Sequence, residues 1–244
     1  MTTPEAPPRR LARSAVHERV LALLADLPRG RLLDVPAGAG ALARRLAQMG
    51  FGVTCSDINA RDFSASELPF RRADLSQVLP FDDASFDYVT CVEGLEHLEN
   101  PFQAIRELAR VLRPGGALVL SMPNYLTIER RLKFLITGSF TKPVPADMLV
   151  EMGPESVAML HLSPAGYTQV KVMLDLAGLE VTGLHRDRVK VKQMLFLWPL
   201  VLLIRLYTRL WSRKARRRYL LDDTAGPALL TGGNTLIIQA RKPK

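Results

Sequence analysis

Three residues that can accept or donate a proton stand close together in the stretch "CVEGLEHLENP": Glu93, Glu96 and His97. Glu93 and Glu96 are three positions apart, so on a helical turn they would share one face, with His97 beside them. A carboxylate or an imidazole near a nucleophilic group can take up its proton. We predict acid–base chemistry here with His97 as the base, while a structural role in capping the loop stays open.

Acidic residues and glycines also follow three short apolar runs. Asp34 ends "RLLD" before the glycines of "PAGAG", Asp57 ends "GVTCSD", and Asp74 lies in "FRRADL". Glycine lets a backbone turn approach a ligand closely, although the same turn can serve packing alone. A carboxylate at the end of the second strand can accept hydrogen bonds from both hydroxyls of a ribose. These positions therefore predict a nucleotide-like cofactor.

The elements that must position these residues alternate between strand and helix. An N-terminal helix is expected within residues 1–30, and further helices over 41–50, 101–116 and 164–177. Strand–helix alternation indicates parallel βαβ units, so we predict an α/β fold with a doubly wound, seven-stranded, mostly parallel sheet. The seven candidate strands are "RLLDV", "FGVTCSD", "FRRADL", "FDYVTCV", "GALVLSM", "LEVTGLH" and "NTLIIQARK".

This ordered set of motifs resembles the class I S-adenosylmethionine-dependent methyltransferases, particularly the group related to ubiquinone-biosynthesis O-methyltransferases, over roughly residues 31–124. The resemblance implies S-adenosylmethionine as the cofactor. It assigns Asp57 to the ribose and Asp74 and Leu75 to the adenine. The first motif would comprise Asp34, Gly38 and Gly40, and the methionine end would be lined by Cys91, Val92 and Glu93.

The chain departs from the family pattern at one point. Pro36 replaces the family's first glycine and removes a backbone donor, yet we expect the cofactor to bind. A Rossmann dehydrogenase is the alternative, with Ala43 at the third glycine position, but the "LRPGG" stretch and the lack of a second nucleotide half favour the methyltransferase. In some relatives the E-x-x-E-H pattern binds a divalent cation, so Mg²⁺ is a further expectation.

Residues 123–163 follow the fifth strand, where a segment can fold over a substrate as a lid. This segment contains "NYLTIERRLKFLITGSF", which is expected to be helical. Asn124, Tyr125 and His161 are candidate substrate contacts, although a histidine just before a helix is often only a cap.

The basic charge is concentrated in one segment. The 244-residue chain has a net charge of +9, yet residues 186–218 hold eleven of its 33 basic residues and one of its 24 acidic residues. This segment belongs to an insertion, residues 186–233, between the last two strands. Its uncharged run from Met194 to Ile204 is shorter than the roughly 20 residues that a spanning helix needs.

We predict that residues 190–218 bind an anionic membrane surface as an interfacial helix, kinked or begun by Pro199. The arginines 205, 209 and 213 recur every four positions, and Trp198, Tyr207 and Trp211 suit that depth. A buried or dimer-forming helix and a grip on RNA phosphates remain alternatives, and nucleic acid is the less expected partner because the flank is aliphatic.

Cys55 and Cys91 offer no disulfide framework, and no apolar region follows the first arginines, so we expect a cytoplasmic protein attached to the inner face of a membrane. The expected function is O-methylation of a lipid, prenylated or polyisoprenoid-linked acceptor by a single domain spanning residues 1–244. Two alternatives are a soluble or glycan acceptor with the insertion only as an anchor, and a non-catalytic membrane or RNA adaptor.

Overall fold

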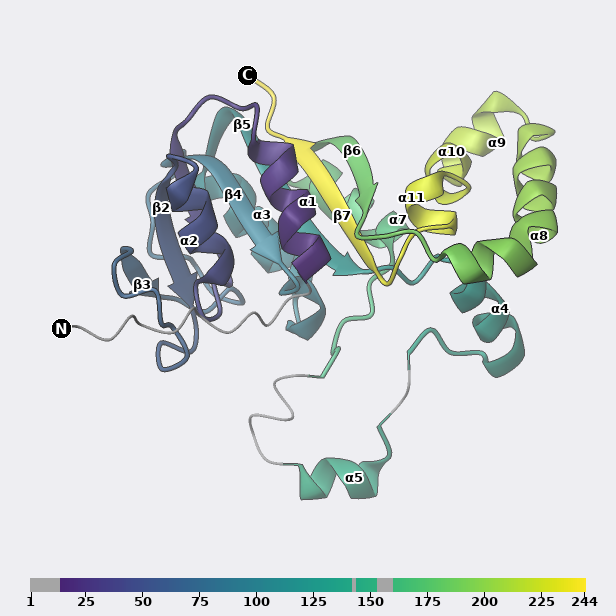
Figure 1. The fold of residues 1–244 in the computed structure, drawn as a ribbon, viewed down its shortest axis with the longest axis horizontal. Helices are drawn as coiled ribbons and strands as arrows, with labels where there is room; N and C mark the ends of the chain where they lie inside the picture. Colours follow the sequence, from purple (N-terminus) through teal and green to yellow (C-terminus); the bar gives the residue numbers. More distant parts are fainter. Residues whose placement is uncertain (1–13, 142–143, 153–159) are drawn as a thin grey trace.

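The structure is a computed structural model, which describes residues 14–141, 144–152 and 160–244. Its centre is a seven-stranded sheet in the order β3-β2-β1-β4-β5-β7-β6, in which β7 runs antiparallel to both neighbours (Figure 1). The strands are β1 (Arg31–Asp34), β2 (Gly52–Asp57), β3 (Phe70–Arg72), β4 (Phe86–Val92), β5 (Leu112–Pro123), β6 (Glu180–Arg186) and β7 (Thr235–Arg241). The predicted fold class is therefore confirmed.

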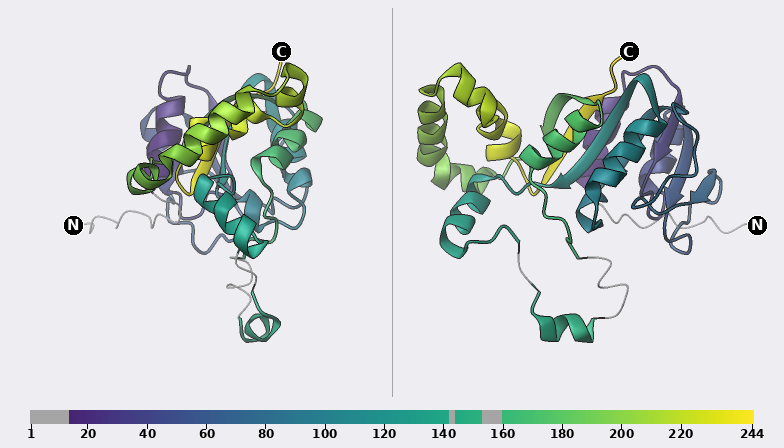
Figure 2. Two further views of the ribbon diagram at one scale, coloured as in Figure 1. Left: turned by 90° about the vertical axis from the view of Figure 1, so that its right-hand side faces the viewer. Right: turned by 180° about the vertical axis from the view of Figure 1, so that it is seen from behind.

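Helices cover both faces of the sheet. The helices α1 (Ser14–Leu24) and α2 (Ala41–Gln48) cover one face, and α3 (Pro101–Val111) and α7 (Tyr167–Leu176) cover the other (Figures 1 and 2). Neighbouring strand residues point to opposite faces, so Leu32 packs in the α1–α2 layer and Leu33 in the α3–α7 layer. The same alternation separates Cys55 from Cys91, and both thiols are free, as predicted.

Strand β5 begins earlier than the pattern "GALVLSM" indicates. Leu112 pairs with Phe86 before the register shifts, and Tyr88 then pairs with Ala117. The stretch "LRPGG" is therefore an irregular part of the strand. Gly116 fits there because a Cβ would lie 2.8 Å from the carbonyl oxygen of Asp87.

The segment after β5 contains α4 (Ile128–Thr137) and α5 (Ala146–Glu151). Helix α4 begins at the N-cap Thr127, whose side chain accepts a hydrogen bond from the amide of Arg130. Helix α5 stands away from the sheet in all three ribbon views (Figures 1 and 2). The structure therefore describes the predicted lid in an extended arrangement, and its closure over a substrate stays a prediction. Residues 142–143 and 153–159 of this segment lie outside the described residues.

The segment between β6 and β7 contains α8 (Val191–Arg209), α9 (Arg213–Arg218), α10 (Leu221–Thr224) and α11 (Pro227–Leu230). A bridge between Val189 and Gly232 closes its base. Pro199 lies inside α8, and Figure 1 shows that this helix changes direction along its length, as expected for an internal proline.

The expected continuous stripe of arginines is not present. Helix α8 ends at Arg209, and Ser212 caps α9 by accepting a hydrogen bond from the amide of Ala215, so Arg213 begins a separate helix. Arg205 donates to the carbonyl of Ala225 at 3.3 Å and so points toward the neighbouring short helices. No helix among the described residues is long and apolar enough to cross a membrane.

Candidate active site

The glycine turn after β1 is held by Asp57, the acid at the end of β2. The amide of Gly38 donates to Asp57 Oδ2 at 2.8 Å, and the amide of Asn59 donates to Oδ1 at 2.9 Å. Parallel strands bring their carboxyl ends to one edge of the sheet. Asp57 therefore fixes the glycine turn from the neighbouring strand, at the position predicted for a ribose-binding acid.

Asp34 is the most unusual group at this edge. Its side chain is buried, Thr90 Oγ1 donates to Oδ1 at 2.6 Å, and Oδ2 has no hydrogen-bond partner among the described residues. The pKa of Asp34 is raised to about 7, chiefly by burial and to a smaller degree by the charge of Asp57, while the Thr90 hydrogen bond lowers it. A cationic ligand here would favour the ionised carboxylate, so this edge fits S-adenosylmethionine, which carries a sulfonium and an ammonium.

Gly40 meets two requirements at once. Its φ of 82° lies in the left-handed region, which residues with a Cβ adopt only with strain. In addition, a Cβ at this position would lie 2.5 Å from the Cβ of Ala65. Pro36 stands in the same turn, and the neighbouring amide of Ala37 donates to the carbonyl of Ser56 at 2.9 Å. The turn is thus anchored beside the proline, although Pro36 itself offers no donor.

Asp74 and Leu75 begin the segment that leads from β3 to β4. Asp74 Oδ1 accepts hydrogen bonds from the amide and the hydroxyl of Ser76, at 2.8 and 2.7 Å, and Leu75 is buried. Both residues therefore help to shape the turn where the resemblance places the adenine. Their contact with a cofactor stays a prediction.

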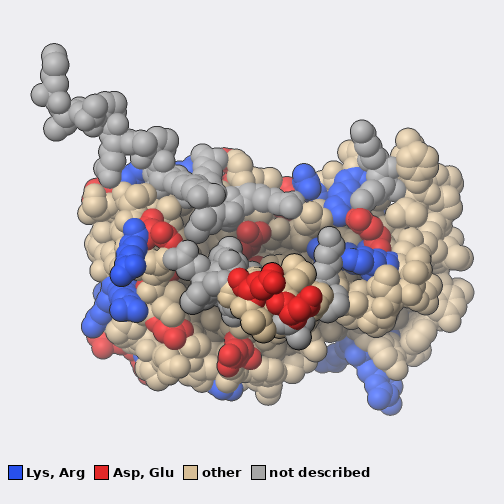
Figure 3. All heavy atoms as spheres, turned by 90° about the horizontal axis from the view of Figure 1, so that it is seen from below, with Lys and Arg blue, Asp and Glu red and all other residues tan. Residues whose placement is uncertain are grey.

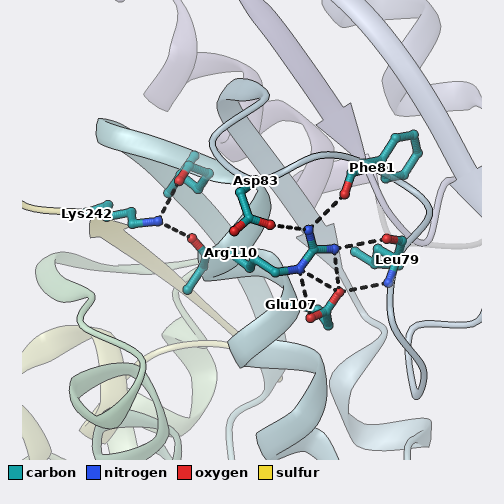
Figure 4. Close-up of polar contacts among 8 residues, drawn as sticks. Leu79, Phe81, Asp83, Glu107, Arg110 and Lys242 are labelled. Carbon is teal, nitrogen blue, oxygen red and sulfur yellow. Dashed lines mark hydrogen bonds and ion pairs between the residues drawn. The ribbon is translucent and has the colours of Figure 1, made fainter.

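Arg110 of α3 forms hydrogen bonds with the last part of the segment that leads from β3 to β4 (Figure 4). Its guanidinium donates to the carbonyls of Leu79 and Phe81 and to the carboxylates of Asp83 and Glu107, at 2.7 to 3.2 Å. Glu107 is buried and accepts the amide of Leu79 at 2.8 Å. Only a planar, forked cation can serve so many acceptors at once.

The residues at the end of β4 differ in their surroundings. Cys91 and Val92 are buried, and burial raises the pKa of the Cys91 thiol, so this cysteine is no nucleophile at neutral pH. Glu93 has a positive φ of 50°, its amide donates to Ser121 Oγ, and its Oε1 accepts from Thr235 Oγ1 at 3.1 Å. Glu93 therefore faces the start of β7.

Glu96 and His97 form the short 3₁₀ helix η1 (Leu95–His97). Glu93 has a left-handed backbone conformation and lies before this helix begins. The expectation that Glu93 and Glu96 share one face of a helical turn is therefore wrong. Glu96 is buried, its Oε2 has no hydrogen-bond partner among the described residues, and burial together with the charge of Glu93 raises its pKa to about 7. The carboxyl group is thus poised to exchange a proton near neutral pH.

His97 is oriented by a single carbonyl group. Its Nδ1 lies 3.0 Å from the carbonyl oxygen of Leu160. A carbonyl can only accept, so Nδ1 carries the proton and, in the neutral ring, Nε2 keeps a free lone pair. The His97 ring also packs edge-on against His161, with 5.2 Å between centroids. The structure therefore brings together the predicted base and the predicted substrate histidine.

Glu96, His97 and His161 can each offer one ligand atom, and these atoms lie within 4.8 Å of one another. The set holds two imidazole nitrogens and one carboxylate oxygen, whereas Mg²⁺ prefers oxygen ligands alone. The donors therefore do not fit the expected Mg²⁺ and are better suited to a first-row transition metal. Glu93 does not belong to this group.

Tyr125 and Asn124 follow β5 but have different surroundings. The Tyr125 hydroxyl shares a hydrogen bond of 3.1 Å with His161 Nδ1, and burial raises the pKa of Tyr125 to about 12. Burial and the nearby charges of His97 and Arg130 lower the pKa of His161. Asn124 is buried, and its Nδ2 donates to the carbonyls of Ala228 and Leu229 in α11 at 3.1 Å. Its amide hydrogens are therefore used within the protein.

A cavity of about 770 Å³ opens beside Tyr125 and His161. It lies between α4 and the residues around Leu160, and its wall contains both apolar and basic side chains. Thr235, Leu160 and this basic wall were not predicted from the sequence. Thr235 could have been found, because an antiparallel β7 places its first residue opposite the last residue of β5. No spacing signal points to Leu160.

Residues 33–120 match the family described as Methyltransferase domain. A ubiquinone biosynthesis O-methyltransferase of Xanthomonas oryzae pv. oryzae is 36% identical over 108 residues, which are 41% of this chain and 45% of that protein. The match thus covers less than half the length of this relative.

Solved structures share the fold over nearly the whole chain. Phosphoethanolamine N-methyltransferase 2 of Haemonchus contortus, in complex with S-adenosyl-L-methionine, has a TM-score of 0.57 at 15% identity and covers 95% of this chain and 53% of its own. The cyclase SpnF has a TM-score of 0.55 at 20% identity and covers 93% of this chain and 80% of its own. At these identities the likeness extends to the fold alone.

Proposed function

Because residues 33–120 match the family described as Methyltransferase domain, we propose that the chain transfers a methyl group from S-adenosylmethionine to an oxygen atom of an amphiphilic acceptor. The acceptor class is a lipid, a prenylated molecule or a polyisoprenoid-linked molecule. The reaction takes place at a membrane surface, on the cytoplasmic face.

Residues at the carboxyl ends of β1 and β2 hold the cofactor. When bound, S-adenosylmethionine supplies an electrophilic methyl group. Asp57 orients the glycine turn through Gly38 and is the acid available to ribose hydroxyls. The unpartnered Oδ2 of Asp34 favours a cation nearby.

His97 is the proposed base in the chemical step. The carbonyl of Leu160 holds Nδ1 at 3.0 Å and leaves Nε2 as the basic nitrogen. An acceptor hydroxyl must lose its proton as its oxygen is methylated, and Nε2 takes that proton up. The buried Glu96, with a pKa of about 7, lies beside it and can pass the proton on.

The surface of α8 supports the membrane part of the proposal. One side of α8 packs through Val201 on Ile128 of α4 and Leu230 of α11. The other side exposes large apolar residues, among them Phe196 at 79% and Leu203 at 61%, and the end of α4 adds Ile136 at 83%. On the face that Figure 3 shows from below, the end of the molecule where α8 lies is drawn mainly in tan. Exposed apolar patches of this kind mark interaction surfaces.

Labelled S-adenosylmethionine tests the reaction. The purified protein is incubated with the methyl-labelled cofactor and fractionated host extract. Label in the organic phase that disappears with Asp57→Ala supports a lipid acceptor. Label confined to the aqueous phase indicates a soluble or glycan acceptor, and no label together with no cofactor binding indicates a non-catalytic adaptor.

Vesicles that contain phosphatidylglycerol test the membrane contact. Phe196→Glu should lower the fraction that sediments with vesicles roughly tenfold, because one buried aromatic side chain is lost from the bilayer. Val78→Glu also replaces an exposed apolar residue by glutamate, but outside α8, and should leave binding unchanged. Equal binding of both variants would contradict the proposed contact.

A further inference from the structure

The wall of the cavity beside His161 contains both charged and apolar side chains. Arg130 and Lys133 of α4 and Lys190 contribute positive charge, Glu129 contributes negative charge, and Phe140 and Leu162 are among the apolar residues of the wall. Its volume of about 770 Å³ lies in the range of small-molecule sites. This combination suits a molecule with an anionic group and an apolar body.

Two of the three cations are available to a ligand. Lys190 Nζ forms an ion pair of 2.7 Å with Glu129, so these two charges offset one another. Among the described residues, no carboxylate lies within ion-pair distance of Arg130 or Lys133. The cavity therefore has excess positive charge beside the proposed reaction centre.

Arg130 is held in position without using up its donors. Its Nη1 donates to the carbonyl of Phe140 at 3.2 Å, and its guanidinium lies 5.2 Å from the centre of the Tyr125 ring. A guanidinium has five N–H groups in a rigid fork that matches the oxygens of phosphate or carboxylate. Lys133 lies one turn further along α4 and can reach the same group as a point charge.

We propose that this cavity binds an anionic oxygen group, a phosphate or a carboxylate, of the methyl acceptor through Arg130 and Lys133. That the bound molecule is the methyl acceptor rests on the proposed function, whereas binding of an anionic group in this cavity does not depend on it. The group anchors the acceptor against α4 while its hydroxyl faces His97 and His161. Tyr125 links the two parts of the site, because its ring contacts Arg130 and its hydroxyl contacts His161.

Phenyl phosphate is a suitable probe, because it combines an anionic group with an apolar ring, and benzyl alcohol is the uncharged control. Binding is measured on the full-length protein by calorimetry at low ionic strength. Lys133→Gln should weaken phenyl phosphate binding roughly tenfold, as expected for the loss of one hydrogen bond to a charged group, and Arg130→Gln should weaken it further. Benzyl alcohol should bind equally to all three proteins.

Lys214→Gln is the matched control, because Lys214 is an exposed lysine of α9 outside the cavity. Phenyl phosphate that binds equally to wild type, Lys133→Gln and Arg130→Gln would overturn the proposal, and so would an equal loss with Lys214→Gln. A loss of vesicle binding with Lys133→Gln, while phenyl phosphate still binds, would assign this lysine to lipid headgroups and also overturn it. The measurement needs no methyl transfer, so the site can be established even where the proposed reaction fails.

Discussion

Asp34 makes the unfolding free energy of the protein depend on pH in a way that its own substitution should remove. The pKa of this carboxyl group is raised from 3.8 to about 7 by burial. A carboxyl group with a raised pKa in the folded state stabilises the fold below its unfolded pKa, and this contribution is lost as the pH rises toward the folded pKa. For these two pKa values the loss between pH 5 and pH 8 is about 3 kcal/mol.

Asp34→Asn keeps the size of the side chain and the carbonyl oxygen that accepts from Thr90, but it cannot ionise. When the pH is raised from 5 to 8, the unfolding free energy of the variant is therefore expected to rise by about 3 kcal/mol relative to that of wild type. Other titrating groups, Glu96 included, are present in both proteins and cancel. Urea unfolding followed by circular dichroism at both pH values gives the free energies by linear extrapolation.

Asp26→Asn is the control, because Asp26 is exposed and should follow wild type at both pH values. The reasoning is refuted if the free energies of Asp34→Asn and wild type differ by the same amount at pH 5 and at pH 8. The proteins are compared without cofactor, because a cationic ligand would itself lower the pKa of Asp34.

Three further predictions concern single residues. Gly40→Ala should lower the unfolding free energy by about 2 kcal/mol or more, measured by urea unfolding, because it combines a left-handed backbone with a close Cβ contact. Arg110→Met should destabilise the fold by about 3 kcal/mol because Glu107 stays buried without its partner, and Arg110→Lys should recover only a small part in the same assay. His97→Gln should lower kcat for methyl transfer by about 10² to 10⁴ with unchanged affinity for S-adenosylmethionine in calorimetry, and full activity of this variant would exclude it as the base.

Most of the sheet was predictable because most of its strands are short apolar runs that end in a turn or an acid; β3, with the sequence Phe-Arg-Arg, is the exception. The residues expected at the cofactor side also lie together, because a parallel sheet gathers its carboxyl ends at one edge. Asp34 and Asp57 are the clearest cases. The unusual pKa of Asp34 was not predictable, since it depends on how completely neighbouring layers bury the carboxyl group.

Residues that come from distant segments were harder to predict. The carbonyl of Leu160 orients His97 only because the chain returns to η1 after a long excursion, and a backbone carbonyl leaves no trace in the residue type. Lys133 and Arg130 were noted only as part of a helical run, and their placement beside His161 depends on the direction in which α4 leaves the sheet. The four-residue spacing of the arginines predicted one continuous helix. The helix instead ends before Arg213, because Ser212 acts as the N-cap of a new helix.

Several side-chain hydrogen bonds tie the inserted short helices to the body of the protein. Asn124 clamps the carbonyls of Ala228 and Leu229, Arg131 bonds the carbonyl of Thr224, and Tyr167 bonds Asp223 at 2.6 Å. A flexible tether would let α8 drift without any effect on the body of the protein. Because α8 packs on α11 through Val201 and Leu230, we expect a displacement of α8 to be transmitted through α11 to Asn124, the neighbour of Tyr125 in the cavity wall.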